Sequence, residues 1–380
     1  MGRQVRIAAV QMDANPAPTE ARLARAARLV AHAAREGADL VVLPELFNSG
    51  YAYADENHRR AETLQGPTAA WMRESAARWN VHLAGSLLLL DQDEVYNALL
   101  LFAPDGRMWR YDKLYPWGWE RGYFRPGRHI AIAETDLGRI GMLICWDTAH
   151  RDLWRRYAGR VDLMVISSCP PDVGNPVYHL PGGVEVTYDD MGPLMAGMKA
   201  SGRLLFGDMI NQQARWLGVP AVNTVGSGHI RTRIPNGLAA MLAFLPMAPW
   251  LARHLGQAEA LEASFDLLPG SKVVGADGAP LSELAQEAGE AFTVAQVTLA
   301  DERPCPQEPQ PPSLISGFVY FCSDVLLPAT VLATYRRGLR RAWGERMAPL
   351  RPSSRQWAFL LGLGVAAGLL IGWLLGRKKR

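Results

Sequence analysis

Short apolar runs alternate with longer segments of helical periodicity along most of the chain. Residues 5–10 (VRIAAV) and 38–45 (ADLVVLPE) are apolar enough to be buried strands. Residues 19–35, which lie between them, are rich in Ala, Arg and Leu and carry apolar positions at helical spacing. Gly37 follows as a C-terminal cap. This opening predicts a strand–helix–strand unit.

The same alternation continues beyond the first unit. Further helices are predicted around residues 67–79, 150–158 and 203–217. Further strands are predicted over residues 81–90, 95–102, 140–147, 161–168 and 219–226. Strands that are apolar throughout are typical of sheets with both faces covered. The pattern therefore predicts an α/β domain with largely buried strands.

Three stretches interrupt this alternation. Residues 171–200 are rich in Gly, Pro and Met and are predicted to be an inserted loop. A second insertion, at about 236–265, begins with the unusually apolar residues 236–256. Residues 303–313 (RPCPQEPQPPS) are a Pro-rich linker that should close the globular body. We therefore expect a body over residues 1–302, a Pro-rich linker with a basic juxtamembrane segment over 303–355, a helix over 356–376 and a basic tail over 377–380.

The helix expected over residues 356–376 has the features of a membrane span. Residues 357–375 form an uninterrupted apolar run of 19 residues, which as a helix spans roughly 28 Å, about the thickness of a bilayer core. Basic residues flank it on both sides, which favours a single-pass C-terminal anchor over a buried core helix. More arginines precede the run than follow it, so we expect the body to be cytoplasmic.

Composition narrows the class of protein. Hydrophobic residues make up 49% and charged residues 20%, which is normal for a globular enzyme and argues against disorder. The net charge is only +3, and much of the basic excess lies near the C-terminus, so a nucleic-acid partner is not expected. Four cysteines lie far apart without metal-site spacing, which argues against a disulfide framework or a zinc site.

Three residues could together carry covalent chemistry. Cys145 and Glu45 each follow an apolar strand, and Lys113 follows a strand in a segment rich in aromatic residues. Taken singly, these could be a core cysteine, a paired carboxylate and a solvated loop lysine. Together, a carboxylate can act as general base to the thiol, and the ammonium can stabilise an oxyanion. A Cys–His pair is disfavoured, because His150 lies only five residues after the cysteine. This acyl-transfer chemistry needs no metal or organic cofactor.

Successive segments of the chain resemble the motifs of the nitrilase (carbon–nitrogen hydrolase) superfamily. In order, these are VRIAAVQMD, GADLVVLPELFNSGY, YDKLYPWGWERGYFRPG, IGMLICWD, VNTVGSG and GSKVVGADGAPL, which extend over about residues 5–300. The resemblance implies an α-β-β-α sandwich with Glu45 as base, Lys113 as oxyanion stabiliser and Cys145 as nucleophile. It also implies that Glu120 positions substrate and lysine, and that the backbone N–H of Trp146 completes the oxyanion hole. We add Tyr51, Trp119 and Cys169 as candidates for the substrate pocket.

The chain departs from the family pattern after the cysteine. The family usually carries a Pro-Glu pair and then an arginine, where this chain has Arg151, Asp152 and Arg155. The helix before VPAVN also lacks the usual Arg-Ala-x-Glu-Asn. These departures leave the catalytic set intact and are expected to bear on substrate choice and subunit contacts.

The sequence thus predicts a membrane-tethered hydrolase of a non-peptide C–N bond (amide, nitrile or carbamoyl) that acts through a cysteine thioester. An N-acyltransferase would use the same thioester, and trials with amine acceptors would distinguish it. A catalytically silent scaffold that assembles in the membrane through Gly364, Gly368, Gly372 and Gly376 is a third hypothesis, which trapping an acyl-enzyme would exclude. We expect a small-molecule or lipid-like substrate, a membrane partner and a homo-oligomer.

One apolar segment extends the membrane hypothesis. Residues 238–251 carry no charge, and a solvent-facing loop of this kind would expose a large apolar patch. The segment could be buried in the core of the chain, against a partner subunit or in a lipid interface. Interfacial burial beside the active site would favour a lipid-like substrate and predicts that charges at Leu242, Phe244 and Trp250 weaken membrane binding.

Overall fold

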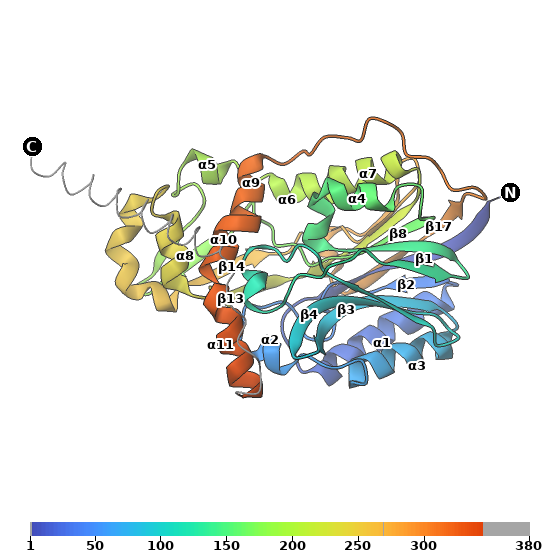
Figure 1. Cartoon of the computed structure of the whole chain (residues 1–380), viewed down its shortest axis with the longest axis horizontal. Coiled ribbons are helices and arrows are strands. Elements are labelled where there is room, and N and C mark those ends of the chain that lie inside the picture. Colours follow the sequence, from blue (N-terminus) through green and yellow to red (C-terminus); the bar gives the residue numbers. More distant parts are fainter. Residues whose placement is uncertain (1, 269, 345–380) are drawn as a thin grey trace, which may run out of the picture.

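Two stacked β-sheets with helices on their outer faces form the body of the protein. The computed structural model describes residues 2–268 and 270–344, and Figure 1 shows the layers edge on. The first sheet has the order β12-β1-β2-β3-β4-β5, with β17 antiparallel to β1. Its strands are β1 (Arg3–Asp13), β2 (Leu40–Val42), β3 (His82–Asp91), β4 (Glu94–Phe102), β5 (Met108–Asp112), β12 (Gly226–Ser227) and β17 (Ala291–Leu299).

The second sheet stacks on the first through an apolar interior. Its order is β16-β15-β11-β8-β7-β6. Ile7 and Val42 of the first sheet belong to the same buried cluster as Met142 and Val165 of the second. Its strands are β6 (Ile132–Thr135), β7 (Gly138–Ile144), β8 (Leu163–Ser167), β11 (Ala221–Thr224), β15 (Lys272–Val274) and β16 (Pro280–Glu283).

The outer faces of the two sheets are covered by helices whose bounds follow local signals. Helices α1 (Thr19–Arg35) and α3 (Pro67–Trp79) cover the first sheet, and α4 (Arg151–Tyr157) and α7 (Ile210–Leu217) cover the second (Figure 1). In α1, Ala26, Val30 and Ala33 recur at helical spacing and are buried. α3 begins at a proline and ends at Asn80 in the left-handed conformation. The expected α-β-β-α sandwich is therefore confirmed.

The two insertions pair with each other, which the sequence analysis did not predict. Residues 171–200 are not simply a loop, because they contain β9 (Val177–Leu180), β10 (Val184–Val186) and the short helix α5 (Pro193–Ala196). A third sheet has the order β10-β9-β14-β13, with β13 (His229–Arg233) and β14 (Glu262–Asp266) bordering the second insertion. Backbone pairing between distant segments turns both insertions into one small layer beside the sandwich.

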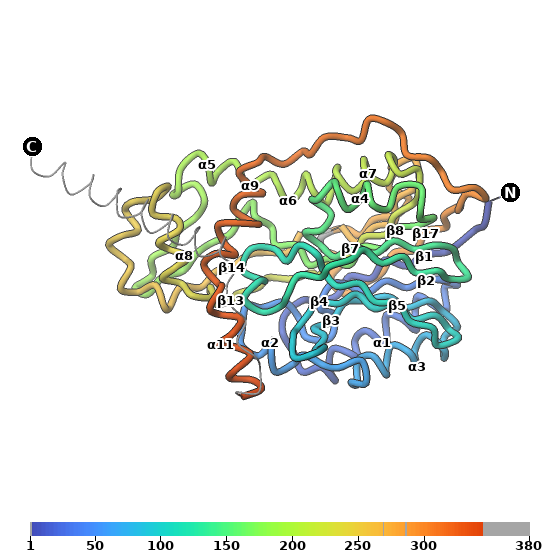
Figure 2. Tube along the Cα trace, in the orientation of Figure 1, coloured from blue at the N-terminus to red at the C-terminus, as the bar shows by residue number. Residues whose placement is uncertain are grey.

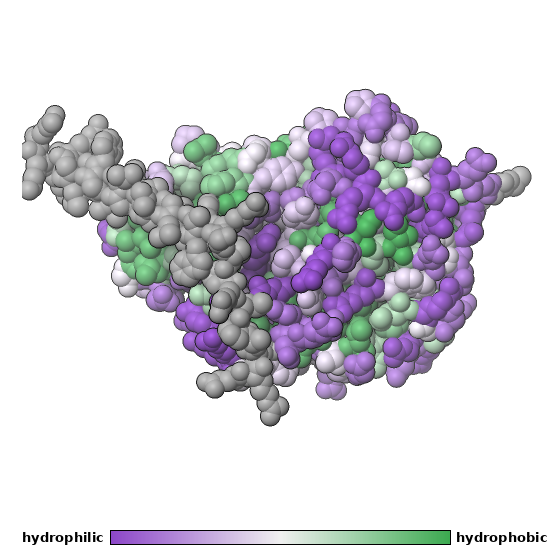
Figure 3. Space-filling view, in the orientation of Figure 1, coloured by the Kyte–Doolittle hydropathy of each residue, from purple (hydrophilic) through white to green (hydrophobic). Residues whose placement is uncertain are grey.

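Most of the apolar second insertion is buried within the chain itself. It folds as α8 (Gly237–Phe244) and the 3-10 helix η4 (Pro249–Ala260). Met241, Phe244 and Leu251 turn inward and line an apolar cavity with residues of β9 and β10. Leu238 and Leu242 are each 41% exposed. Figure 3 shows hydrophobic side chains gathered at this end of the molecule. Packing within the chain thus accounts for the inward-facing residues of this insertion, whereas Leu238 and Leu242 remain exposed on its outer face.

Part of the expected linker over residues 303–355 is a packed helical segment. Residues 303–316 cross the outside of α7 and α4, as Figure 2 shows in orange, with Gln307 N donating to Trp216 O at 2.9 Å. The chain then forms α9 (Gly317–Phe321), η6 (Cys322–Leu326), α10 (Leu327–Thr330) and α11 (Leu332–Trp343). Val319, Leu326 and Val331 are buried against the body. The linker prediction was wrong for residues 317–343, because these apolar positions need a surface to cover them.

The structure bears on the membrane hypothesis only in part. Within residues 2–268 and 270–344, no single helix has the length and apolar character of a membrane span. The helical pair Gly317–Thr330 and Leu332–Trp343, bent by 50°, satisfies those criteria only when taken together. The anchor expected over 356–376 and the tail over 377–380 lie outside the described residues.

Candidate active site

Cys145 lies on a sharp turn between a strand and a short helix. Strand β7 ends at Ile144, and Cys145 is the first residue of the 3-10 helix η2 (Cys145–Ala149). Its φ angle is 46°, in the left-handed region that residues other than glycine seldom occupy. Backbone strain of this kind is typical of functional sites, where the surrounding structure holds the residue in place. The turn presents the thiol at the end of the second sheet.

A buried carboxylate stabilises this turn. Asp147 Oδ2 accepts a hydrogen bond from Ile144 N at 3.1 Å and from the Tyr111 hydroxyl at 2.8 Å, and its Oδ1 accepts from Tyr115 N at 2.8 Å. Burial raises the pKa of the Asp147 carboxyl to about 6, against the opposing charge of Lys113 and these hydrogen bonds. The sequence analysis did not assign a role to Asp147, although it directly follows the Cys-Trp pair.

Lys113 lies between two carboxylates from different segments of the chain. Its Nζ is 2.8 Å from Glu45 Oε1 and 2.7 Å from Glu120 Oε2. Glu45 follows β2, Lys113 directly follows β5, and Glu120 lies in the 3-10 helix η1 (Gly118–Gly122). All three side chains are buried. Glu120 and Cys145 line the same cavity, so these contacts bring the four residues together.

Neighbouring polar groups orient the two glutamates. Asn97 Nδ2 donates to Glu45 Oε1 at 2.7 Å, and the Tyr51 hydroxyl donates to Glu120 Oε1 at 3.1 Å. Trp117 N donates to Glu120 Oε2 at 2.8 Å. Glu45 Oε2 is also buried but has no hydrogen-bond partner among the described residues. Both carboxylate oxygens of Glu120 therefore accept hydrogen bonds, whereas Oε2 of Glu45 is free to accept a proton.

Burial and charge determine the resting protonation of the site. Burial opposes a charge on Lys113, but the carboxylates of Glu120 and Glu45 outweigh it and raise the pKa of the ammonium, which stays protonated. Burial, together with the Glu45 charge, raises the pKa of the Cys145 thiol well above its ordinary value. Burial raises the pKa of Glu120 to about 7, with Lys113 opposing. Cys145 is thus a neutral thiol at rest and needs a base at the moment it attacks.

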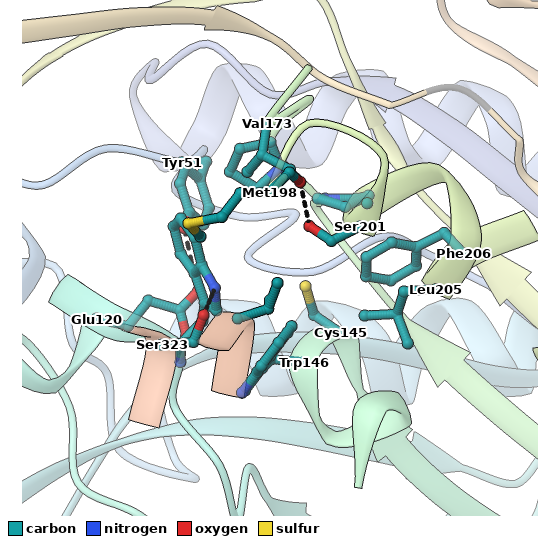
Figure 4. Close-up of a pocket in the computed structure, with 15 residues that line it drawn as sticks. Tyr51, Glu120, Cys145, Trp146, Val173, Met198, Ser201, Leu205, Phe206 and Ser323 are labelled. Carbon is teal, nitrogen blue, oxygen red and sulfur yellow. Dashed lines mark hydrogen bonds between the residues drawn. The ribbon is translucent and has the colours of Figure 1, made fainter. Parts of the chain in front are cut away.

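A mostly apolar cavity, partly open to solvent, lies in front of the thiol (Figure 4). The residues that line it come from loops and 3-10 helices that follow strands of both sheets, from the first insertion, from α6 (Ser201–Arg203) and the π-helix η3 (Leu204–Met209), and from the C-terminal helices. They are Tyr51, Trp117, Glu120, Cys145, Trp146, Pro170, Pro171, Val173, Met198, Ser201, Gly202, Leu205, Phe206, Val319 and Ser323.

Of the three pocket candidates, the structure places only Tyr51 on this cavity. Trp119 lines the separate apolar cavity between the two insertions, because its ring points toward Tyr178. Cys169 lines neither cavity, and its sulfur packs close to Gly226, where an added Cβ would lie 2.7 Å from it. Trp119 and Cys169 therefore do not line the cavity in front of the thiol. Trp119 directly precedes Glu120 in the chain, but its ring faces the cavity between the two insertions.

The C-terminal helical segment completes the site. Val319 and Ser323 line the cavity, and Trp117 Nε1 donates to Ser323 Oγ at 2.9 Å. Trp146 Nε1 donates to Asp324 Oδ1 at 2.9 Å. The sequence analysis missed these residues because it assigned residues 303–355 to a linker. The signal was present, since apolar residues recur at helical spacing on both sides of the Ser323-Asp324 pair.

The residues that depart from the family pattern contact the same C-terminal region. Arg151 Nη2 donates to the backbone oxygen of Gln310 at 2.9 Å, and Gln310 Nε2 donates back to Arg151 O at 2.9 Å. Asp152 accepts a hydrogen bond from the Tyr115 hydroxyl at 3.3 Å. None of these side chains lines the cavity. Within the described residues, no group of three or more His, Cys, Asp and Glu side chains could hold a metal ion.

Comparisons with known proteins relate the chain to one family. The family model described as Carbon-nitrogen hydrolase matches residues 6–181. The chain is 30% identical over 148 residues to a nitrilase of Pyrococcus abyssi, covering 38% of this chain and 56% of that protein. It is 30% identical over 164 residues to an omega-amidase of Danio rerio, covering 40% and 58%. The chain thus spans less than two thirds of the length of these curated relatives.

Solved structures extend the similarity to most of the chain. The Saccharomyces cerevisiae Nit3 structure, from branch 10 of the nitrilase superfamily, has a TM-score of 0.56 and 20% identity, covering 78% of this chain and 90% of that one. An amidase from Nesterenkonia sp. AN1, carrying acrylamide added at its active-site cysteine, has a TM-score of 0.55 and 20% identity, covering 79% and 94%. At this identity the likeness establishes a shared fold.

Proposed function

We propose that the chain is a carbon–nitrogen hydrolase, as the family model matched over residues 6–181 suggests, and that it hydrolyses a non-peptide C–N bond through a thioester on Cys145. One observation carries the proposal: a strained, buried thiol lies beside a lysine held between two carboxylates, and one of those carboxylates keeps a free oxygen. The nitrilase, omega-amidase and amidase activities of the relatives agree with it.

In the acylation step, Cys145 Sγ attacks the carbonyl carbon of an amide. The thiol proton passes to Glu45, which has the unpartnered oxygen. A carbon–sulfur bond forms, and the carbon–nitrogen bond breaks as Glu45 returns the proton to the leaving nitrogen. Ammonia or an amine departs and leaves a thioester. Because burial raises the pKa of the thiol, proton removal and attack occur together rather than through a stable thiolate.

In the deacylation step, Glu45 takes a proton from water, whose oxygen attacks the thioester carbon. The carbon–sulfur bond breaks, the sulfur takes the proton back from Glu45, and the carboxylic acid is released. Overall, one water adds across one C–N bond. Each tetrahedral intermediate carries an oxyanion, for which we assign the Lys113 ammonium and the Trp146 backbone N–H as stabilising groups.

The roles of the two glutamates differ in this scheme. Glu120 accepts three hydrogen bonds, counting Lys113, Tyr51 and the Trp117 backbone, and has no free position at which to act as a base. It keeps the Lys113 ammonium in place. Glu45 shares Lys113 but has a free oxygen, so it is the group that moves protons.

The test is a screen of the purified protein against amides, nitriles and carbamoyl amines, with release of ammonia or amine as the readout. Intact mass spectrometry of the stalled reaction should show one added acyl group, located on Cys145 by peptide mapping. Cys145→Ala should lose both signals. Activity that survives in Cys145→Ala above a few per cent would contradict the mechanism. Adding an amine acceptor to the same reaction distinguishes hydrolysis from acyl transfer.

We also propose that the enzyme is tethered to a membrane with its body in the cytoplasm. The support is the apolar run over residues 357–375 and its basic flanks. Fractionation of cells that produce the full chain should place it in the membrane pellet until detergent is added. Full-length protein that stays in the supernatant without detergent would contradict the tether.

A further inference from the structure

The wall of the catalytic cavity facing the thiol is apolar. Leu205 and Phe206 of η3 lie on one side of Cys145 in Figure 4, with Val173 and Met198 across the cavity. Each of these four side chains is at most 8% exposed. Apart from Tyr51 and Ser201, the upper part of the cavity offers a bound acyl group little but hydrocarbon surface.

The charged groups around the cavity do not favour an anion. Among the described residues that line the cavity, Glu120 is the only acidic one, and none is a lysine, arginine or histidine. The nearest cation, Lys113, is already shared between two carboxylates. Arg203 is 75% exposed at its side chain and pairs with Asp172 at 3.4 Å. Arg121 does not line the cavity.

From these two features we infer that the enzyme accepts amides with an uncharged, apolar acyl group and rejects those with a second carboxylate. The inference rests on the proposed function and specifies its substrate class. An alkyl chain entering the cavity leaves water for an apolar wall, which favours binding. A carboxylate in the same place would lose its hydration, find no free cation and face Glu120, which is unfavourable on each count.

A pair of matched amides tests the substrate class. Hexanamide and adipamic acid have the same six-carbon chain and the same reacting amide, but adipamic acid carries a carboxylate where hexanamide has a methyl group. We expect kcat/KM for hexanamide to exceed that for adipamic acid by a factor on the order of 100 or more, because a buried carboxylate would stay unpaired. Equal values, or a preference for adipamic acid, would overturn the inference.

A pair of leucine variants tests which wall is responsible. Leu205 lines the cavity and is 1% exposed, whereas Leu281 lies on β16, is 49% exposed and lines no part of it. Leu205→Ala should lower kcat/KM for hexanamide about tenfold while changing that for acetamide little, since only the longer chain reaches the wall. Leu281→Ala should change neither. Equal losses on both amides in Leu205→Ala would contradict the assignment of this wall.

Two further measurements keep the test decisive. If Leu205→Ala unfolds, as its thermal midpoint would show, Phe206→Ala replaces it with the same expected contrast between long and short amides. Failure of the proposed function looks different, because then no amide or nitrile releases ammonia and no acyl group appears on Cys145. An enzyme that acylates Cys145 but prefers adipamic acid would retain the proposed function and lose only this inference.

Discussion

Asp324 accepts a hydrogen bond from the indole Nε1 of Trp146 at 2.9 Å, although 178 residues separate them in sequence. Trp146 directly follows the nucleophile Cys145 and lines the cavity. The hydrogen bond therefore fastens the C-terminal helical segment to the residue whose backbone N–H we assign to the oxyanion.

We predict that Asp324→Ala lowers kcat about tenfold, since losing the hydrogen bond frees the Trp146 ring and loosens the oxyanion donor. Asp324→Asn should recover most of the activity, because an amide oxygen can still accept from the indole. Asp136→Ala, at a residue whose side chain is 74% exposed, serves as the control and should match wild type. The readout is kcat on a single amide, and equal rates in Asp324→Ala and wild type would refute the role.

The pH dependence should report on Glu120. Burial raises its pKa to about 7, so protonation below that pH weakens its hold on Lys113. We expect kcat/KM to fall as the pH drops below about 7, and this limb should be absent in the slower Glu120→Gln variant. The stability of the fold depends on pH in the opposite direction, because a raised pKa means that the folded state favours the protonated Glu120 carboxyl. This group's contribution is complete below about 4.5 and is lost as the pH rises toward about 7.

The strained turn at the nucleophile should be measurable as stability. Cys145 has a φ of 46°, which glycine adopts freely and alanine does not. Cys145→Ala and Cys145→Gly should both be inactive, but the glycine variant should be more stable by about 1 kcal/mol. Urea denaturation of the two variants measures the difference. A less stable glycine variant would indicate that the turn is not strained.

Two truncations should separate the tether from the site. Removing residues 351–380 deletes the proposed anchor but leaves the described helices through Trp343, so the protein should remain active on small amides. Removing residues 314–380 also takes away Val319, Ser323 and Asp324, which form part of the cavity wall. That variant should lose most of its kcat, measured on the same amide. Full activity in the longer deletion would show that the helical segment is dispensable for catalysis.

The apolar second insertion can be divided by exposure. Leu242 is 41% exposed, whereas Phe244 is 5% exposed and lines the cavity between the insertions. Phe244→Glu should destabilise the fold by about 3 kcal/mol or more, because it buries a charge. Leu242→Glu should change stability by less than about 0.5 kcal/mol. In protein shortened by residues 351–380, we expect Leu242→Glu to weaken binding to liposomes. Unchanged binding would leave Leu242 as ordinary surface.

Trp250 does not test the membrane interface as cleanly as Leu242. Its indole Nε1 donates to the backbone oxygen of Asp190 at 3.2 Å, and its ring stacks edge-on with His254. A charged substitution there would disturb the contact between the two insertions as well as any lipid contact. Leu242 is therefore the position at which stability and membrane binding can be measured independently.

The sequence by itself determined the elements of the sandwich and the places where chemistry could occur. α1 and α3 begin and end where the periodicity and the flanking Pro, Asn and Gly residues indicate. Cys145 and Glu45 each follow an apolar strand, and Lys113 follows the strand β5. These are local properties, since the spacing of apolar residues decides whether a segment buries one face or two, and a strand end is visible within a few residues.

Only the tertiary structure decided what surrounds those residues. Asn97 reaches Glu45 across 52 positions and Asp324 reaches Trp146 across 178, and no local spacing encodes either contact. The sequence also could not tell whether Lys113 is solvated or buried between two carboxylates, because its environment comes from three separate segments. The same holds for the two insertions, because strand β9 of the first pairs with β14 at the end of the second. Side-chain direction and long-range pairing depend on the packed whole, because each is the outcome of competition among all available contacts.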